Sequence, residues 1–186
     1  MRILMLSWEY PPHIVGGLGQ HVADLVPALA AHGVDVDVVT PLWKTASEFI
    51  DFPGVTVHRV PVALGDGDIM DQALRVNQTL ELAARSVVEG QPGFDLIHAH
   101  DWLVSFAAIG LKEVLQLPLL ATVHATEFGR SQGRLDSPLS RDIHSAEWRL
   151  VFEAWRVIVC SNFMATELIG NLGAPPDKVD VIPNGV

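Results

Sequence analysis

A glycine-rich stretch near the start of the chain has the composition of a phosphate-binding loop. The segment EYPPHIVGGLGQHV places Gly16, Gly17 and Gly19 between an apolar run and a helical pattern. Glycines let backbone N–H groups approach a phosphate, and a helix N-terminus adds partial positive charge. The spacing G-G-x-G differs from the G-x-G-x-x-G fingerprint of dinucleotide-binding folds, which disfavours an NAD dehydrogenase. The loop therefore predicts a phosphate site, with a tight turn that packs a helix on a strand as the alternative.

Two histidines and an aspartate, His98, His100 and Asp101, lie at the end of a predicted strand, in the segment IHAHDW. His98 and His100 are two residues apart, so in a strand both side chains point to the same face, a spacing that metal ligands use. A metal site needs a third and a fourth ligand, and the sequence assigns none, so we expect no metal; a hydrogen-bonded histidine at the sheet edge is the alternative. Asp101 followed by Trp102 is typical of sites that hold a sugar by hydrogen bonds and ring stacking. Asp101 could equally cap the helix that follows.

A third polar group follows a later apolar run, in TVHATEFGR. His124 ends that run, and Glu127 and Arg130 come after it in a polar loop. The carboxyl ends of parallel strands meet at one edge of a sheet, where ligands bind. We therefore expect the glycine loop, Asp101 and His124 to converge on one cleft.

Composition bounds the class of protein. The 186 residues are 49% hydrophobic and 18% charged, which suits one globular domain with a sizeable core. The formal net charge of −10 disfavours nucleic-acid and anionic-membrane partners, because these select a basic surface. No apolar run reaches the ~18 residues of a membrane span, and a single cysteine excludes an intramolecular disulfide. These observations predict a cytoplasmic protein, with Cys160 as a buried strand residue and Ser161 as a helix cap.

Short β-branched runs alternate with helical patterns along the chain, which predicts an α/β fold: a Rossmann-like, doubly wound parallel sheet with helices on both faces. The helix after residue 67 is expected to bury one apolar face. Its members are Ile69, Ala73, Val76, Leu80, Ala83 and Val87. The predicted strands are residues 2–7, 34–40, 55–60, 94–99, 119–124, 157–160 and 179–182. The predicted helices are residues 18–29 (ended by Gly33), 68–88, 103–115, 140–155 and 162–172.

Four segments in matching order carry a resemblance to a known family: SWEYPPHIVGGLGQHV, IHAHDW, TVHATEFGR and VIPNGV. Together they resemble the N-terminal half of a retaining GT-B glycosyltransferase, close to the bacterial glycogen and starch synthases and to glycosyltransferase family 4. The resemblance implies two Rossmann-like domains that face each other across a cleft. Residues 1–186 would then be a single N-terminal, acceptor-side domain, and the C-terminal donor-binding domain would be absent from this chain.

The resemblance also implies roles for single residues. His124 would lie beside the transferred sugar, and His124 and Asp101 would be the catalytic residues. Bacterial glycogen synthases usually carry K-x-G-G-L, whereas HIVGGL here has no lysine; Arg130 or Arg134 is a hypothetical substitute cation. The implied donor diphosphate site comprises Gly16, Gly17 and Leu18, and the implied acceptor or sugar site comprises Glu9, Trp102, Glu127 and Arg130.

The function that the resemblance implies is transfer of a hexose, glucose above all, from a nucleotide-sugar to a glucan or glucoside acceptor with retention. The donor would be ADP-glucose or UDP-glucose, with neither cofactor nor metal. The isolated domain would be inactive, because the donor base and ribose would be held by the missing domain. A stand-alone carbohydrate-binding or regulatory Rossmann-like module is the alternative, and an epimerase or phosphorylase relative is a third possibility. We expect no nucleic-acid or membrane partner.

Overall fold

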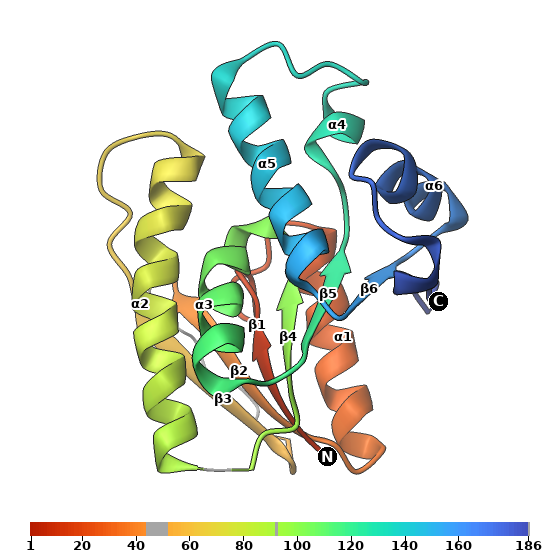
Figure 1. Cartoon of the computed structure of the whole chain (residues 1–186). Coiled ribbons are helices and arrows are strands. Elements are labelled where there is room, and N and C mark those ends of the chain that lie inside the picture. The colour runs from red at the N-terminus through yellow and green to blue at the C-terminus, as the bar shows by residue number, and fades with distance from the viewer. Residues whose placement is uncertain (44–51, 92, 186) are drawn as a thin grey trace.

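The computed structural model describes residues 1–43, 52–91 and 93–185 of the chain (Figure 1). The strands in these ranges are β1 (Arg2–Leu6), β2 (Asp35–Leu42), β3 (Val55–Pro61), β4 (Leu96–His100), β5 (Leu119–Val123), β6 (Arg156–Val159) and β7 (Val179–Val181). The helices are α1 (Gly17–Ala31), α2 (Ile69–Gly90), α3 (Ser105–Leu115), α4 (Glu127–Arg130), α5 (Pro138–Glu153) and α6 (Asn162–Asn171), with 3-10 turns η1 (Trp102–Val104) and η2 (Pro176–Lys178).

The described strands form one parallel sheet in the order β3-β2-β1-β4-β5-β6-β7. The chain builds outward from β1 in one direction through β2 and β3, and then from β4 in the other. In such a sheet the strand order reverses between the two central strands, and a crevice opens outside their carboxyl ends. The crevice here lies at the ends of β1 and β4. The predicted α/β, Rossmann-like fold class is confirmed.

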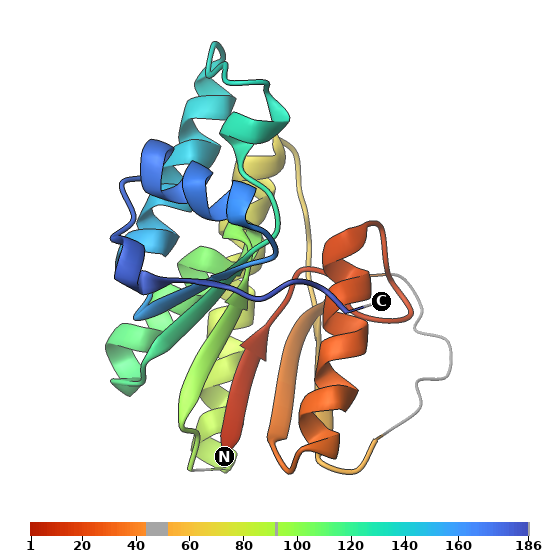
Figure 2. The same ribbon diagram turned by 90° about the vertical axis from the view of Figure 1, so that its right-hand side faces the viewer.

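Helices cover both faces of the sheet, as Figure 2 shows when the sheet is seen nearly edge-on. The side chains of β1 alternate: Ile3 and Met5 pack in one cluster with α1, while Leu4 and Leu6 pack in the larger cluster with α2, α3 and α5. Both faces of β1 are therefore buried, which explains why a central parallel strand reads as a continuous apolar run. No helix in the described part of the chain combines the length and the apolar character that crossing a membrane requires.

Local side-chain chemistry fixes where the helices begin. Asp68 caps α2 by accepting hydrogen bonds from the backbone N–H groups of Met70 and Asp71, and Ser137 caps α5 in the same way. Pro138 then opens α5, in the first turn, where a backbone N–H group would have no partner within the helix. Ser161 caps α6 by accepting from the N–H of Met164, as predicted.

The predicted strands and helices are all present, and the differences are local. β2 continues to Leu42, two residues beyond the prediction, because Pro41 pairs only with β3 and its missing N–H group interrupts no ladder with β1. In α2 the buried residue of the first turn is Met70, whereas Ile69 is 37% exposed. Cys160 is half-buried just beyond the end of β6, so its predicted place inside the strand was wrong. Helix α4 and the turns η1 and η2 were not predicted from the sequence.

Candidate functional site

Three segments from the predicted site meet at the carboxyl edge of the sheet. The glycine loop follows β1, Asp101 follows β4 and His124 follows β5, which lies beside β4. The backbone N–H of His124 donates to Oδ1 of Asp101 at 2.7 Å, so the last two segments are joined directly. The three segments therefore lie at the same edge of the sheet.

The glycine loop leaves the first turn of α1 open. Gly16 is the N-cap and provides no side-chain cap, and none of the residues of the first turn is itself acidic. A Cβ atom added at Gly16 or Gly17 would meet nothing within 4 Å, so the backbone here borders open space. The first N–H groups of a helix have no partner within the helix, and the helix dipole adds partial positive charge. The start of α1 is thus suited to an anion.

Glu9 holds this loop in place. Its Oε2 accepts from the backbone N–H groups of Val15 at 2.8 Å and Gly16 at 3.1 Å. A Cβ at Gly19 would lie 2.6 Å from the same oxygen, so glycine is needed there for close approach. The carboxylate that we predicted on the acceptor side is therefore engaged by the loop. Because Glu9 takes the N–H of Gly16, the amides of Gly17 and Leu18 remain for a ligand.

Asp101 is buried, with 7% of its surface exposed. Its side chain makes no helix-capping bond, so the capping alternative does not hold. Burial is the main cause that raises the pKa of Asp101 to about 7, opposed by hydrogen bonds from the backbone of the segment after β5 and by the charge of Arg130. A carboxyl group in this state can accept a hydrogen bond from the backbone of His124 and still exchange a proton near neutral pH.

Four histidines gather beside Asp101. His98 Nε2 lies 2.8 Å from Thr122 Oγ1 inside the sheet, and His100 Nδ1 lies 3.2 Å from His124 Nε2. His21, from α1, places its ring centroid 4.7 Å from that of His124. Burial lowers the pKa of His98 to about 3 and that of His124 to about 4, and it lowers the pKa of His100 as well. The imidazoles of His98, His100 and His124 are therefore neutral at physiological pH and can donate or accept hydrogen bonds.

The alternative role proposed for His98 is confirmed in part. His98 is hydrogen-bonded and only 3% exposed, but it lies between β1 and β5 in the middle of the sheet, not at the sheet edge. The hydroxyl of Thr122 on the neighbouring strand satisfies it. His98 thus packs under the cluster as a structural residue.

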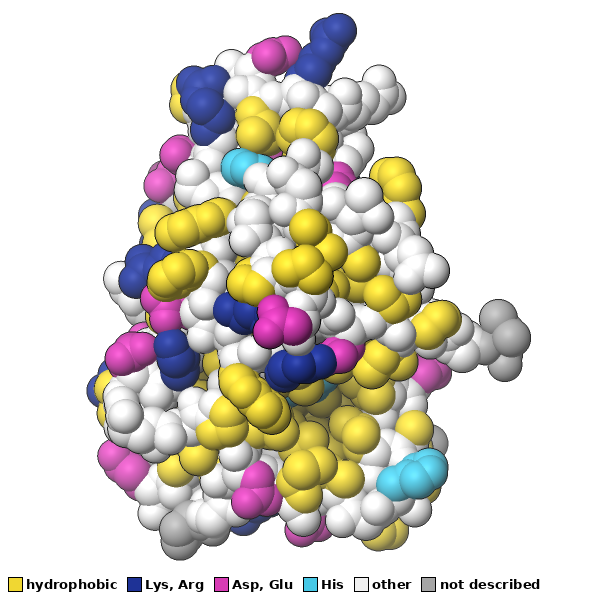
Figure 3. Space-filling view, turned by 45° about the vertical axis from the view of Figure 1, so that its right-hand side comes forward, with side chains coloured by type: hydrophobic (Ala, Val, Ile, Leu, Met, Phe, Trp, Pro, Cys, Tyr) yellow, Lys and Arg dark blue, Asp and Glu magenta, His cyan; other side chains and the backbone are white. Residues whose placement is uncertain are grey.

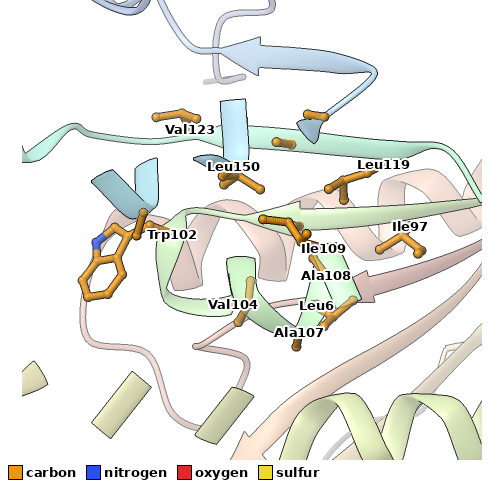
Figure 4. Close-up of a cluster of buried hydrophobic side chains, with 14 of the residues drawn as sticks. Leu6, Ile97, Trp102, Val104, Ala107, Ala108, Ile109, Leu119, Val123 and Leu150 are labelled. Atoms are coloured by element: carbon orange, nitrogen blue, oxygen red, sulfur yellow. The ribbon is translucent and has the colours of Figure 1, made fainter. Parts of the chain in front are cut away.

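Trp102 turns away from the cleft. It begins η1 and is 5% exposed, within the apolar cluster that includes Ile97, Leu119 and Leu150 (Figure 4). The 3-10 turn directly after β4 rotates the indole into the core, which leaves it little free ring face for stacking on a sugar. This placement disfavours the role that we predicted from the Asp101-Trp102 pair.

The segment after His124 forms α4 and is held by a buried carboxyl group. Glu147, on α5, is 2% exposed; its Oε1 accepts from the N–H of Glu127 at 2.7 Å and from the guanidinium of Arg130 at 3.1 Å. Burial raises the pKa of Glu147 to about 8. Thr126 caps the helix and donates to Glu167 at 2.7 Å. Glu127 and Arg130 therefore lie near the cleft, and Glu147 already takes part of their hydrogen-bonding capacity.

A groove with a volume of about 870 Å³ runs from the cleft along the α1 face of the sheet. Its polar end is lined by Gly17, Gln20, His21 and Asn184, and its other walls are mostly apolar. Figure 3 shows hydrophobic side chains gathered around this hollow in the lower half of the molecule. The C-terminal segment closes the polar end, since Asn184 Oδ1 lies 2.9 Å from His21 Nδ1. The groove can therefore receive a ligand that is polar at one end.

Sequence reasoning missed three of these residues. His21 follows the glycine loop at the position that faces the sheet, and its place on the inner side of α1 is the signal that could have identified it. Glu147 carried no signal in the sequence, because the residue that it holds lies 20 residues away. Asn184 lies in the VIPNGV segment that carried the resemblance, but its contact with His21, 163 residues away, could not be predicted from that segment. The spacing G-x-S-x-G, which hydrolases use for a nucleophilic serine, occurs at residues 129–133, across the end of α4 and the turn after it. Ser131 there donates to Glu127 and does not stand on a strand-to-helix turn.

Comparison with known proteins identifies the family. The family described as Glycosyltransferase Family 4 matches residues 15–186. An uncharacterized glycosyltransferase of Methanocaldococcus jannaschii is 35% identical over 186 residues, which cover 100% of this chain and 46% of the relative. A glycogen synthase of Mycobacterium tuberculosis is 38% identical over 202 residues, covering 100% of this chain and 48% of the relative. The chain thus spans about half the length of the curated relatives it matches.

Solved structures share the fold. A sucrose-phosphate synthase from Thermosynechococcus elongatus superposes with a TM-score of 0.77 at 19% identity, covering 100% of this chain and 48% of that one. The catalytic domain of starch synthase IV from Arabidopsis thaliana, bound to ADP and acarbose, superposes with a TM-score of 0.69 at 18% identity, covering 99% and 51%. At these identities the likeness shows the fold alone.

Proposed function

The chain belongs to glycosyltransferase family 4, and from this premise we propose that residues 1–186 form the acceptor-side domain of a retaining hexosyltransferase. The proposed reaction moves glucose from a nucleotide-sugar to a glucan or glucoside acceptor, as the glycogen-synthase relative suggests. ADP-glucose and UDP-glucose are the proposed donors. A C-terminal donor-binding domain is proposed to complete the enzyme, since the chain spans about half the length of its relatives. We also propose a cytoplasmic location.

One observation carries the proposal: an open helix N-terminus, a neutral histidine and a buried carboxyl group lie together at the switch point of the sheet. The amides of Gly17 and Leu18 are proposed to hold the donor diphosphate, with the positive end of α1 behind them. His124 is proposed to contact the transferred sugar. Asp101 fixes the backbone of His124 by their hydrogen bond and so positions that imidazole.

In the proposed reaction the bond between the anomeric carbon and the donor phosphate oxygen breaks, and the acceptor hydroxyl oxygen bonds to the same face of that carbon. The proton of the acceptor hydroxyl passes to the departing phosphate oxygen. This route requires neither a metal nor a pair of glycosidase-like carboxylates. The amides at the start of α1 would stabilise the negative charge that develops on the phosphate.

The experiment that tests this proposal assays the full-length product of the gene with ADP-glucose, UDP-glucose and GDP-mannose, using glycogen and maltoheptaose as acceptors. We expect transfer from one donor, a loss of about 100-fold or more in His124→Ala, and weakened donor binding in Gly17→Asp. An aspartate suits the first turn of a helix, so Gly17→Asp should keep its thermal stability. His32→Ala, on the far end of α1, is the matched control and should retain activity.

Two results separate this proposal from its alternative. Residues 1–186 alone should fold and show no transfer, because the proposed partners of the donor base and ribose lie in the second domain. A folded full-length protein that binds glycogen but transfers from none of the donors would contradict the proposal. That outcome would favour a carbohydrate-binding or regulatory module.

A further inference from the structure

We propose that His21, His100 and His124 form a binding site for one divalent transition-metal ion such as Zn²⁺, which excludes the sugar substrate from the cleft. One nitrogen from each of the three imidazoles lies within 4.8 Å of the other two. They come from α1, from the end of β4 and from the residue after β5, so three separate elements of the fold bring them together. From the sequence, only the pair His98 and His100 had metal-ligand spacing. In the structure His98 is a structural residue bonded to Thr122, and only His100 belongs to the cluster.

The spacing of the nitrogen atoms is close to that of a zinc site. Zn–N bonds of about 2.0–2.1 Å in tetrahedral geometry place two ligand nitrogens about 3.4 Å apart. His100 Nδ1 and His124 Nε2 are already 3.2 Å apart. The ligand nitrogen of His21, a partly exposed residue, lies within 4.8 Å of both. An ion between them would replace the single hydrogen bond that the first two imidazoles can share.

His21 is prepared as a ligand by its neighbour. Its Nδ1 lies 2.9 Å from the amide oxygen of Asn184. An amide oxygen only accepts hydrogen bonds, so Nδ1 carries the proton and Nε2 presents its lone pair. Metal-binding histidines are characteristically fixed in this way, by a second ring nitrogen that donates to an oxygen. Cys160 donates to the same oxygen at 3.2 Å, which agrees with its role as an acceptor.

His100 supplies the buried nitrogen of the cluster. It is fully buried, and its Nδ1 is the atom that lies 3.2 Å from His124 Nε2. Its other nitrogen, Nε2, has no hydrogen-bond partner within the described part of the chain, and an ion at Nδ1 leaves that atom as it is. The imidazole is held between the rings of His98 and His124, at centroid distances of 4.3 and 5.5 Å. Its position is therefore preset.

The site keeps one side open. His21 and His124 are partly exposed, and His21 lines the polar end of the groove next to Gly17. Three histidines with an open fourth position form the arrangement in which zinc also binds water or an oxygen ligand. Imidazole ligands select Zn²⁺ and its neighbours over Mg²⁺, which prefers oxygen. The exclusion of substrate rests on the proposed function, because it needs the sugar to lie beside His124.

The test begins with binding alone, so it does not depend on activity. We would titrate Zn²⁺ into the chelator-treated chain by calorimetry, and Co²⁺ while recording its visible spectrum. We expect one Zn²⁺ per chain with micromolar affinity, a tetrahedral Co²⁺ spectrum, and no response to Mg²⁺. His21→Ala should abolish this binding, and Asn184→Ala should weaken it about 10-fold. His32→Ala, at the C-cap of the same helix and outside the cluster, should bind as the unchanged protein does.

Two results would overturn the site: no binding at millimolar Zn²⁺, or equal affinity in the unchanged protein and in His21→Ala. His21 is partly exposed on a helix, so its alanine variant should fold, and circular dichroism checks this. Inhibition is measured separately on the full-length enzyme, where Zn²⁺ should suppress transfer and a chelator should restore it. Zinc binding without inhibition would contradict the exclusion of substrate; absence of any transfer would instead count against the proposed function.

Discussion

The position of Asp101 combines a strained backbone with a buried carboxyl group. Its φ of 60° and ψ of 175° lie in a region that residues with a side chain rarely adopt. The N–H of Asp101 donates to the carbonyl of Thr122 at 2.9 Å, and its carboxyl group accepts from the N–H of His124. These two bonds to the neighbouring strand enforce the conformation, so one residue joins the ends of β4 and β5.

This double connection predicts different outcomes for two substitutions. Asp101→Asn keeps an acceptor oxygen and removes a charge that burial disfavours, so its free energy of unfolding should stay within about 1 kcal/mol of the unchanged value. Asp101→Ala leaves the N–H of His124 without its partner and should cost about 1–3 kcal/mol. Urea unfolding measures both. Equal stability of the alanine variant would show that the bond contributes nothing to folding.

Glu147 predicts how stability depends on pH. Burial raises its pKa from 4.5 to about 8, against the opposing effects of the Glu127 N–H and Arg130 and with support from the charges of Asp101 and Glu127. The folded state therefore binds this proton more tightly than the unfolded state does. The resulting stability is full below pH 4.5 and is lost as the pH rises through about 8, by at most about 1.4 kcal/mol per pH unit.

Replacement of the carboxyl group should flatten that profile. Glu147→Gln cannot ionise, so its free energy of unfolding should fall less than that of the unchanged chain between pH 5.5 and pH 8.5. Urea unfolding at the two pH values gives the comparison. Glu89→Gln, at an exposed carboxylate of α2, is the control and should follow the unchanged chain. Parallel profiles for Glu147→Gln and the unchanged chain would contradict the assignment.

At the scale of elements, two glycines in the first turn of α1 differ in what an added side chain would meet. Gly19 needs the absence of a side chain, because a Cβ would lie 2.6 Å from Oε2 and 3.0 Å from Cβ of Glu9. Gly19→Ala should displace Glu9, break its bonds to the loop and lower stability by about 1–2 kcal/mol. Gly17→Ala meets open space and should leave stability unchanged or slightly higher. Thermal unfolding separates the two, and equal loss in both would refute the distinction.

The positions of strands and helices could be predicted from the sequence better than the contacts between them. Period-two and period-3.6 patterns predict the strands and long helices, because those depend on which residues are apolar. The first turn of α2 was predicted with Ile69 inside, whereas Met70 is buried; the two residues stand four and three positions before buried Ala73, so helical spacing alone does not choose between them. Trp102 was predicted in the cleft because nothing local signals a 3-10 turn. His21 and Asn184 meet only through the fold.

At the scale of the whole molecule, the two faces of the sheet are covered unequally. One face is packed under α2, α3 and α5, and its strand residues are buried; Leu119 is 0% exposed. On the other face α1 covers β1 and β2, while Leu96, Leu120 and Ile158 line the groove and remain partly exposed. Adjacent residues of β5 therefore face very different surroundings. The groove is a property of the whole sheet and of no single element.

This asymmetry predicts that neighbouring leucines tolerate a charge differently. Leu119→Glu buries a carboxylate in the larger core, at a cost of several kcal/mol that is comparable to the roughly 5–15 kcal/mol stability of a domain, so the chain should fail to fold. Leu120→Glu reaches water through the groove and should fold, losing less than about 2 kcal/mol. Near-ultraviolet circular dichroism and urea unfolding of the 186-residue chain test both. If Leu120→Glu unfolds as completely as Leu119→Glu, the α1 face is as closed as the core, and the groove cannot admit a ligand.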